Sequence, residues 1–299
     1  MNKTEGFVSV EGGRVWYRSV GSGGIPVLLL HGGPGAGHDY FEPLEALGAD
    51  RQVIFYDQLG CGRSDRPDNP ALWRIERFVS EVAQVRRALG LSHIHLLGHS
   101  WGGFLAIEYL LGQPAGVASV VLASTAASIP EVLGEIQGLK AQLPDAVRDV
   151  MDRYEATGDF ANPEYQAAVM EFYKLYLCRL DPWPDCLMRT VANLDGNQVY
   201  LTMNGPNEFT VVGNLKDWER RDRIHEINVP TLVTVGGYDE VPLACAQTLH
   251  NGVRGSELAV FDQSSHMAML EETDTYIRRL VDFLTRVEEA TVKAVQPGR

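Results

Sequence analysis

The fold of this chain is constrained most by its short apolar runs. These runs end in glycine-rich loops and alternate with segments of helical periodicity. Val27–Leu30 and Val53–Tyr56 are continuous apolar runs of this kind. Strands that are buried on both faces have this character, and the helices that cover them lie between them in the chain. We therefore predict an α/β fold with a mostly parallel central sheet and helices on both faces.

Further elements continue the alternation. Residues 8–17 are predicted to form an antiparallel hairpin that turns on glycines. Apolar residues recur at helical spacing from Ile75 to Leu89, and Gly90 follows where a helix end favours glycine. Later strands are predicted at residues 93–97, 119–123, 231–235 and 257–261, followed by a last helix at 273–289 and a frayed tail after Thr291.

One long segment departs from this alternation. Residues 129–228 are helical in pattern, rich in aromatic residues and broken by prolines. We interpret them as a helical cap inserted into an α/β core that consists of residues 1–128 and 229–299. Its aromatic residues are interpreted as packing, with an apolar pocket as the alternative. These residues are Phe172, Tyr173, Tyr176 and Trp183.

Charge and cysteine content exclude several classes of function. The 299 residues carry a formal net charge of −13, which would repel a nucleic-acid backbone. No apolar run approaches the about 20 residues that cross a bilayer, and the first residues do not resemble a secretory signal. Four cysteines without metal-ligand spacing indicate free thiols. We expect a cytoplasmic protein with no cofactor, no metal, and no nucleic-acid or membrane partner.

The most informative motif is Gly98-His99-Ser100-Trp101-Gly102, between a predicted strand and a helix that is apolar nearly all round. It matches the G-x-S-x-G pattern of the nucleophile elbow, in which a sharp turn presents the serine hydroxyl above the sheet. The glycines let the backbone pack closely, and the start of the following helix favours negative charge. Ser100 is therefore predicted to be a nucleophile rather than a structural serine.

A serine nucleophile needs a base and an acid that orients the base. Of the eight histidines, only His266 lies in a loop directly after a late strand. Asp239 follows the predicted strand at 231–235 through a glycine-rich loop, which places it at the same sheet edge as Ser100. The order serine, aspartate, histidine is that of the α/β-hydrolases. Asp262 is the alternative acid.

Backbone amides complete the predicted site. His31-Gly32-Gly33-Pro34-Gly35 follows the first buried strand, where this fold places one amide of the oxyanion hole. We predict that the amides of Gly33 and Trp101 stabilise the tetrahedral oxyanion. A simple turn is the alternative for the glycine-rich segment.

These segments together resemble the proline iminopeptidases, which include the tricorn-interacting aminopeptidases and are close to the amino-acid amidases. The resemblance extends from the first hairpin to the last helix and rests on HGGPG (31–35), DQLGCGRS (57–64), GHSWGG (98–103) and NGPNEF (204–209). It implies that Ser100, Asp239 and His266 form the catalytic triad. It also implies that Glu208 and Glu240 bind the free amino group of the substrate. Without the resemblance, we would interpret Glu208 as a solvated cap residue and Glu240 as a neighbour of the acid.

We predict a serine aminopeptidase that releases N-terminal residues, with proline as one candidate, through an acyl-enzyme on Ser100. Its substrate would be a small peptide or amino-acid amide with a free amino terminus. The alternative is an amino-acid amidase, or an esterase or lactonase for another small acyl substrate. An epoxide hydrolase or dehalogenase is disfavoured because those relatives have aspartate in place of the serine. A non-catalytic receptor is disfavoured by the complete triad.

Overall fold

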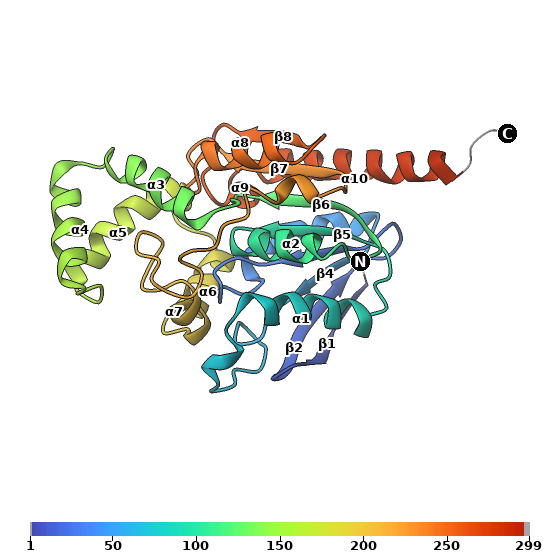
Figure 1. Ribbon diagram of the computed structural model, residues 1–299, viewed down its shortest axis with the longest axis horizontal. Helices are drawn as coiled ribbons and strands as arrows, with labels where there is room; N and C mark the ends of the chain where they lie inside the picture. Colours follow the sequence, from blue (N-terminus) through green and yellow to red (C-terminus); the bar gives the residue numbers. More distant parts are fainter. Residues whose placement is uncertain (1, 296–299) are drawn as a thin grey trace.

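A single eight-stranded sheet forms the centre of the computed structural model, which describes residues 2–295 (Figure 1). The strands lie in the order β1-β2-β4-β3-β5-β6-β7-β8. Their bounds are β1 Lys3–Val10, β2 Gly13–Val20, β3 Val27–Leu30, β4 Val53–Tyr56, β5 Ile94–His99, β6 Val117–Ala123, β7 Thr231–Gly236 and β8 Glu257–Phe261. β2 pairs antiparallel with β1 and β4, and every pair from β4 to β8 is parallel. The predicted α/β fold with a mostly parallel sheet is confirmed.

Helices cover both faces of this sheet. The helices of the core are η1 (Asp39–Ala49), η2 (Pro70–Leu72), α1 (Ile75–Ala88), α2 (Trp101–Leu111), α8 (Leu243–Gly252), α9 (Ala268–Glu271) and α10 (Thr273–Val295). α1, α2 and α8 pack on the face that Leu28 and Leu96 present, whereas η1, α9 and α10 pack on the face that Leu29 and Leu97 present. Successive strand residues point to opposite faces, so a continuous apolar run is needed to serve both layers.

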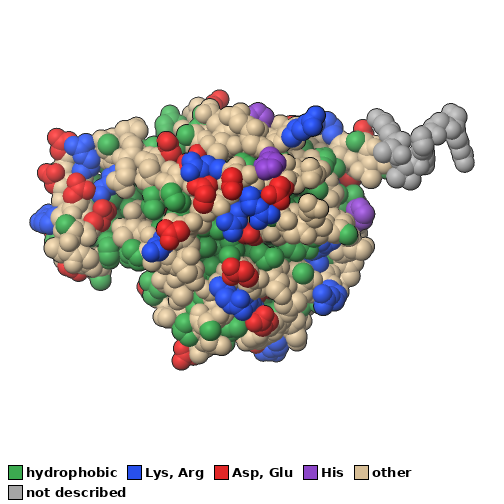
Figure 2. Space-filling model, in the orientation of Figure 1, with side chains coloured by type: hydrophobic (Ala, Val, Ile, Leu, Met, Phe, Trp, Pro, Cys, Tyr) green, Lys and Arg blue, Asp and Glu red, His purple; other side chains and the backbone are tan. Residues whose placement is uncertain are grey.

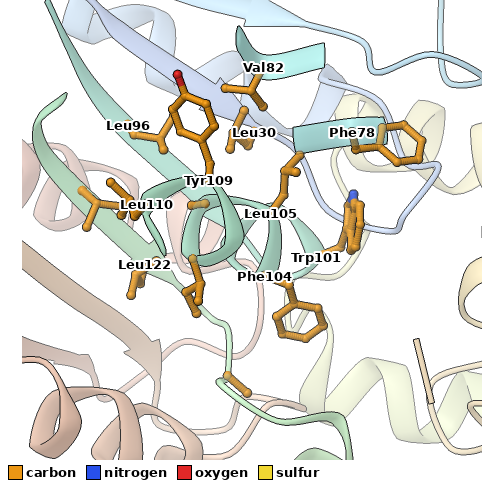
Figure 3. Packing of buried hydrophobic residues seen from close by; sticks show 14 of the residues in the cluster. Leu30, Phe78, Val82, Leu96, Trp101, Phe104, Leu105, Tyr109, Leu110 and Leu122 are labelled. Carbon is orange, nitrogen blue, oxygen red and sulfur yellow. The ribbon is translucent and has the colours of Figure 1, made fainter. Parts of the chain in front are cut away.

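α2 lies at the centre of one of these layers, between the sheet and its neighbouring helices (Figure 3). The ring of Trp101 lies edge-on to Phe78 of α1, with 5.8 Å between centroids. Phe104 stacks on Trp218, which follows the cap helices in the chain, at 4.5 Å. Because α2 is buried on nearly every side, its first residue holds a fixed position, and so does Ser100 immediately before it.

The helical insertion lies between β6 and β7. Its helices are α3 (Ile129–Lys140), α4 (Asp145–Thr157), α5 (Pro163–Tyr176), α6 (Asp185–Leu194) and α7 (Gln198–Met203), followed by η3 (Ile224–Glu226). α3, α4 and α5 form an arm that projects beside the sheet (Figure 1) and has a separate hydrophobic cluster around Met151, Tyr165 and Phe172. A backbone bridge joins Ser128 to Glu219 near the two ends of the insertion. The division of the chain into residues 1–128, 129–228 and 229–299 stays a prediction.

Several element boundaries differ from the prediction. β1 and β2 pair over eight residues each and so extend beyond residues 8–17 on both sides. α10 continues to Val295, so the frayed tail predicted after Thr291 is wrong up to that residue. No glycine or proline interrupts the helix before Pro297, and each added residue gains a backbone hydrogen bond. The rest of the predicted tail, residues 296–299, lies outside the described residues.

The surface of the described chain shows no dominant charge pattern on the face seen in Figure 2. Acidic and basic side chains are intermixed there. Among residues 2–295, every helix falls short of the length and apolar character that crossing a membrane requires.

Candidate active site

Ser100 occupies a strained turn between β5 and α2. Its φ of 55° and ψ of −122° lie outside the regions that most side chains adopt, and its backbone N–H donates to the Ala123 carbonyl over 2.9 Å. A Cβ on Gly98 would lie 2.2 Å from the Gly102 oxygen, and one on Gly102 would lie 2.0 Å from the Leu30 oxygen. Only glycine fits at these two positions, which is the steric requirement of a nucleophile elbow.

His266 and Asp239 lie together in the loops after β8 and β7. His266 Nδ1 is 2.6 Å from Asp239 Oδ1, and both side chains are buried. The Asp239 carboxylate also accepts backbone N–H groups from Gly236 and Val241, at 3.3 and 2.9 Å. An acid held in this way orients the imidazole of the base. The alternative acid, Asp262, is exposed and makes no such contact within the described residues.

The end of α5 contributes to the position of His266. The backbone carbonyl of Tyr176, at the end of α5, accepts the N–H groups of both His266 and Glu240, each over 3.1 Å. Because this one carbonyl holds two loops that follow different strands, the position of His266 depends on the packing of α5.

Ser100 and His266 line one cavity of about 620 Å³ between the core and the cap. This volume lies within the usual range for small-molecule sites. Among the described residues no hydrogen bond joins Ser100 Oγ to His266, and His266 Nε2 instead lies 3.6 Å from Glu240 Oε1. Such catalytic contacts are often long before substrate binds. The cap side of the cavity is mainly apolar and includes Met170, Trp183, Leu187, Met188, Val191 and Leu201.

Two carboxylates, Glu208 and Glu240, line the same cavity. Glu208 accepts hydrogen bonds from two tyrosine hydroxyls, that of Tyr173 on α5 and that of Tyr200 on α7, the latter over 2.5 Å. Glu240 is buried, and its Oε2 has no hydrogen-bond partner among the described residues. A buried carboxylate oxygen without a partner is costly, so this site is suited to a cationic ligand.

Burial and charge shift the ionisation of the site. Burial raises the pKa of Glu240, and the negative charges of Glu208 and Asp239 raise it further. Burial alone would lower the pKa of His266, but the carboxylates of Asp239 and Glu240 outweigh it and raise that pKa above its ordinary value. The site therefore carries an excess of carboxylates around a single base.

The predicted oxyanion amides lie near Ser100. Gly33 lines the cavity with a φ of 112°, and a Cβ there would lie 2.4 Å from the Gly35 nitrogen. Trp101 is the first residue of α2, where a backbone N–H has no acceptor within the helix. The roles of the two amides stay a prediction.

A side-chain amide joins the two segments that carry these backbone amides. The Trp101 indole donates to Gln58 Oε1 over 2.8 Å, and Gln58 Nε2 donates to the His31 carbonyl over 3.1 Å. The glycine-rich segment after β3 is therefore tied to the start of α2 through one glutamine.

The aromatic residues of the cap divide into two groups. Tyr173 and Trp183 line the cavity, as the alternative interpretation expected, and each also packs against a hydrophobic cluster, whereas Phe172 and Tyr176 pack in the cluster of the arm. Sequence reasoning also missed Tyr200, because no motif marks a tyrosine whose partner is a carboxylate in another loop.

The described residues offer no metal ligands in a cluster. No group of three or more His, Cys, Asp or Glu side chains within residues 2–295 is arranged to hold an ion. All four cysteines are free and buried.

Comparison with known proteins first identifies the class. Residues 25–273 match the family model of the alpha/beta hydrolase fold. The chain is 41% identical over 291 residues to a proline iminopeptidase of Saccharolobus solfataricus, with 96% of this chain and 94% of the relative covered. It is 41% identical over 286 residues to that of Heyndrickxia coagulans, with 95% and 99% covered. The crystal structure of a proline iminopeptidase from Mycobacterium smegmatis superposes with a TM-score of 0.90 at 35% identity, with 96% and 100% covered. The chain belongs to the proline iminopeptidase family of α/β-hydrolases.

Proposed function

We propose that this chain is a serine aminopeptidase that releases N-terminal residues, proline among them, from short peptides through an acyl-enzyme on Ser100. One observation carries the proposal: two carboxylates, Glu208 and Glu240, share a cavity with Ser100 and His266. A substrate ammonium ion would supply the partner that Glu240 Oε2 lacks. The names of the relatives, proline iminopeptidases, support the choice of substrate.

The reaction would proceed in two proton-balanced stages. In acylation, His266 takes the Ser100 proton as Oγ attacks the scissile carbonyl, and it then gives that proton to the leaving amine. The amides of Gly33 and Trp101 would stabilise the oxyanion. In deacylation, water replaces the leaving group, His266 takes a proton from the water, and Ser100 recovers it when the acyl bond breaks.

The position of the carboxylates sets the number of residues released. An ammonium ion held at Glu208 and Glu240 keeps the first α-carbon of the peptide close to Ser100, so the first peptide bond is the one attacked. The hydroxyls of Tyr173 and Tyr200 hold the Glu208 carboxylate, and both tyrosines line the same cavity. A blocked N-terminus has no ammonium ion for the two carboxylates, so a blocked peptide would be a poor substrate, which favours an exopeptidase.

The test is to replace Glu208 with glutamine and compare substrates with and without a cation. Glu208→Gln keeps the size of the side chain but removes its charge. Losing one partner of a partly buried ion pair costs about 2–5 kcal/mol, so kcat/KM for a free aminoacyl ester should fall about 30-fold to a few thousand-fold. The N-acetylated ester, which has no cation, should change little.

The control is Glu171→Gln, which removes the same charge from an exposed position on α5. It should leave both substrates unaffected. Equal losses on the free and acetylated esters in Glu208→Gln would count against ammonium recognition, and an amino-acid amidase, esterase or lactonase without amine selectivity would then be the better description.

The proposal includes a cytoplasmic location. Its support is that all four cysteines are free thiols buried within the fold, as is common in a reducing compartment.

A further inference from the structure

Tyr40 of η1 and His99 of the elbow lie buried in the wall of the active-site cavity and join three parts of the site. The backbone N–H of Gly32 donates to Tyr40 Oη over 2.7 Å, and Tyr40 Oη is 2.9 Å from His99 Nδ1. His99 Nε2 is 3.0 Å from the backbone oxygen of His266. One chain of hydrogen bonds therefore links the glycine-rich oxyanion loop, the nucleophile elbow and the loop of the base.

The donor and acceptor chemistry of these groups determines where each proton lies in the chain of hydrogen bonds. The backbone oxygen of His266 can only accept, so His99 Nε2 carries a hydrogen. Burial holds the pKa of His99 well below its ordinary value, and the neighbouring His266 lowers it further, so the ring is neutral and Nδ1 is an acceptor. The Tyr40 hydroxyl, which accepts from Gly32, then donates its single proton to Nδ1.

We propose that Tyr40 and His99 are positioning residues. The hydrogen-bond chain that they form, called the relay below, holds the oxyanion loop and the base at the separation that acyl transfer from Ser100 requires. This inference rests on the function proposed above for Ser100 and His266. The relay acts only through backbone atoms of Gly32 and His266, so neither side chain has to touch the reacting atoms.

Tight packing at the relay supports this role. A Cβ on Gly32 would lie 3.2 Å from Ser100 Cβ, 3.3 Å from Tyr40 Oη and 3.4 Å from His99 Nδ1. The oxyanion loop therefore lies directly against the nucleophile and the relay. If the bond from Tyr40 is removed, Gly32 loses the acceptor that holds it there, and catalysis is sensitive to shifts of about 1 Å.

The neutrality of the relay serves the base. The rings of His99 and His266 are 4.6 Å apart. His266 becomes an imidazolium during acylation, and a second positive charge at that distance would oppose it. A neutral histidine that is held by a tyrosine hydroxyl fixes the base loop without this repulsion.

The test is a double-mutant cycle of Tyr40→Phe and His99→Gln, measured by kcat and KM on one free aminoacyl ester. Each single variant should lose about 10- to 100-fold in kcat with KM little changed, because the geometry of the reacting groups is altered rather than the ammonium site. The double variant should lose no more than the worse single variant, because both substitutions break one relay.

The matched control is Tyr109→Phe. Tyr109 is also buried and also bonded, to Arg86 Nη1 over 2.7 Å, but it lies nine residues along α2 from Ser100, about 13 Å away. Its loss of a hydroxyl should leave kcat unchanged. Thermal unfolding shows which variants are folded. If Tyr40→Phe does not fold, the expected loss of about 10- to 100-fold in kcat is tested with His99→Gln alone.

Three results would overturn the relay: wild-type kcat in a single variant, losses that multiply in the double variant, or a change in KM alone. Ser100→Ala, assayed in parallel, separates the two proposals. If Ser100→Ala is inactive and Tyr40→Phe is fully active, the relay is wrong and the proposed function stands. If Ser100→Ala retains turnover, the proposed function fails, and the relay fails with it.

Discussion

At the scale of single residues, the site is governed by the balance between one buried base and the carboxylates around it. Asp239 contacts His266 Nδ1, and Glu240 lies on the Nε2 side at 3.6 Å. Each carboxylate favours the protonated imidazole, which strengthens His266 as a base but lowers the fraction of free enzyme in which it is deprotonated. A bound ammonium ion between Glu208 and Glu240 would offset this effect, which links substrate binding to activation of the base.

This balance predicts a pH dependence. As the proposed base, His266 would act in its deprotonated form, and its pKa is raised in the free enzyme, so the acid limb of kcat/KM should lie above the ordinary histidine value of about 6.5. With a free aminoacyl ester, the acid limb of kcat should lie at lower pH than that of kcat/KM, because the bound ammonium ion favours the neutral imidazole.

Replacement of Glu240 tests whether this carboxylate raises the pKa of His266. In Glu240→Gln, the acid limb of kcat/KM for an N-acetylated ester should move to lower pH, because one of the carboxylates that raises the pKa of His266 is gone. Glu171→Gln should leave the limb in place. An unchanged acid limb in Glu240→Gln would mean that Glu240 does not act on the base.

At the scale of elements, glycines in helices have opposite roles in the core and in the cap. Gly102 in α2 packs against the backbone of β3, whereas Gly138 in α3 has open space where a Cβ would lie. The first glycine permits close packing, and the second only adds freedom to the unfolded chain.

We predict that Gly102→Ala destabilises the protein by about 1–3 kcal/mol through overpacking and also lowers kcat, because the shifted helix carries Ser100. Gly138→Ala should raise the free energy of unfolding by about 0.5–1 kcal/mol and leave kcat unchanged. Urea unfolding and steady-state kinetics measure both. A Gly102→Ala variant with wild-type stability would show that α2 can move away from β3 at no cost.

At the scale of the whole molecule, the last helix is joined to the beginning of the fold through one carboxylate. Glu288 Oε1 of α10 accepts from Arg51 Nη1 over 2.9 Å, lies 3.1 Å from His95 Nε2 and accepts the Ile25 N–H over 3.3 Å. Arg51 and His95 are buried, so the loss of this acceptor leaves donors without a partner. These contacts lie near the amino ends of the parallel strands, whereas the active site lies at their carboxyl ends.

We therefore predict that Glu288→Ala lowers the free energy of unfolding by about 1–3 kcal/mol without changing kcat. The neighbouring residue Glu289 is exposed, and Glu289→Ala removes the same charge. That control should stay within about 0.5 kcal/mol of the wild type. Equal stability of the two variants, measured by denaturant unfolding, would contradict the role given to Glu288.

Local sequence patterns were sufficient to predict much of this fold. Continuous apolar runs at Val27–Leu30 and Val53–Tyr56 require cover on both faces, whatever the rest of the chain does. Glycines around Ser100 indicate the elbow, since the chemistry of a sharp strand-to-helix turn is encoded within five residues. The pairing of His266 with Asp239 also followed, because the carboxyl ends of parallel strands meet at one sheet edge.

Tertiary structure alone decided which side chains from distant segments meet. The contacts of Tyr173 and Tyr200 with Glu208, and of Tyr40 with His99, could not be predicted from the sequence. Periodicity indicates which face of an element is buried but not which residues it contacts there. The direction of Glu240 toward His266 depends on how α5 packs, through the carbonyl of Tyr176. The family resemblance implied roles for Glu208 and Glu240, and only the tertiary packing places their carboxylates in one cavity.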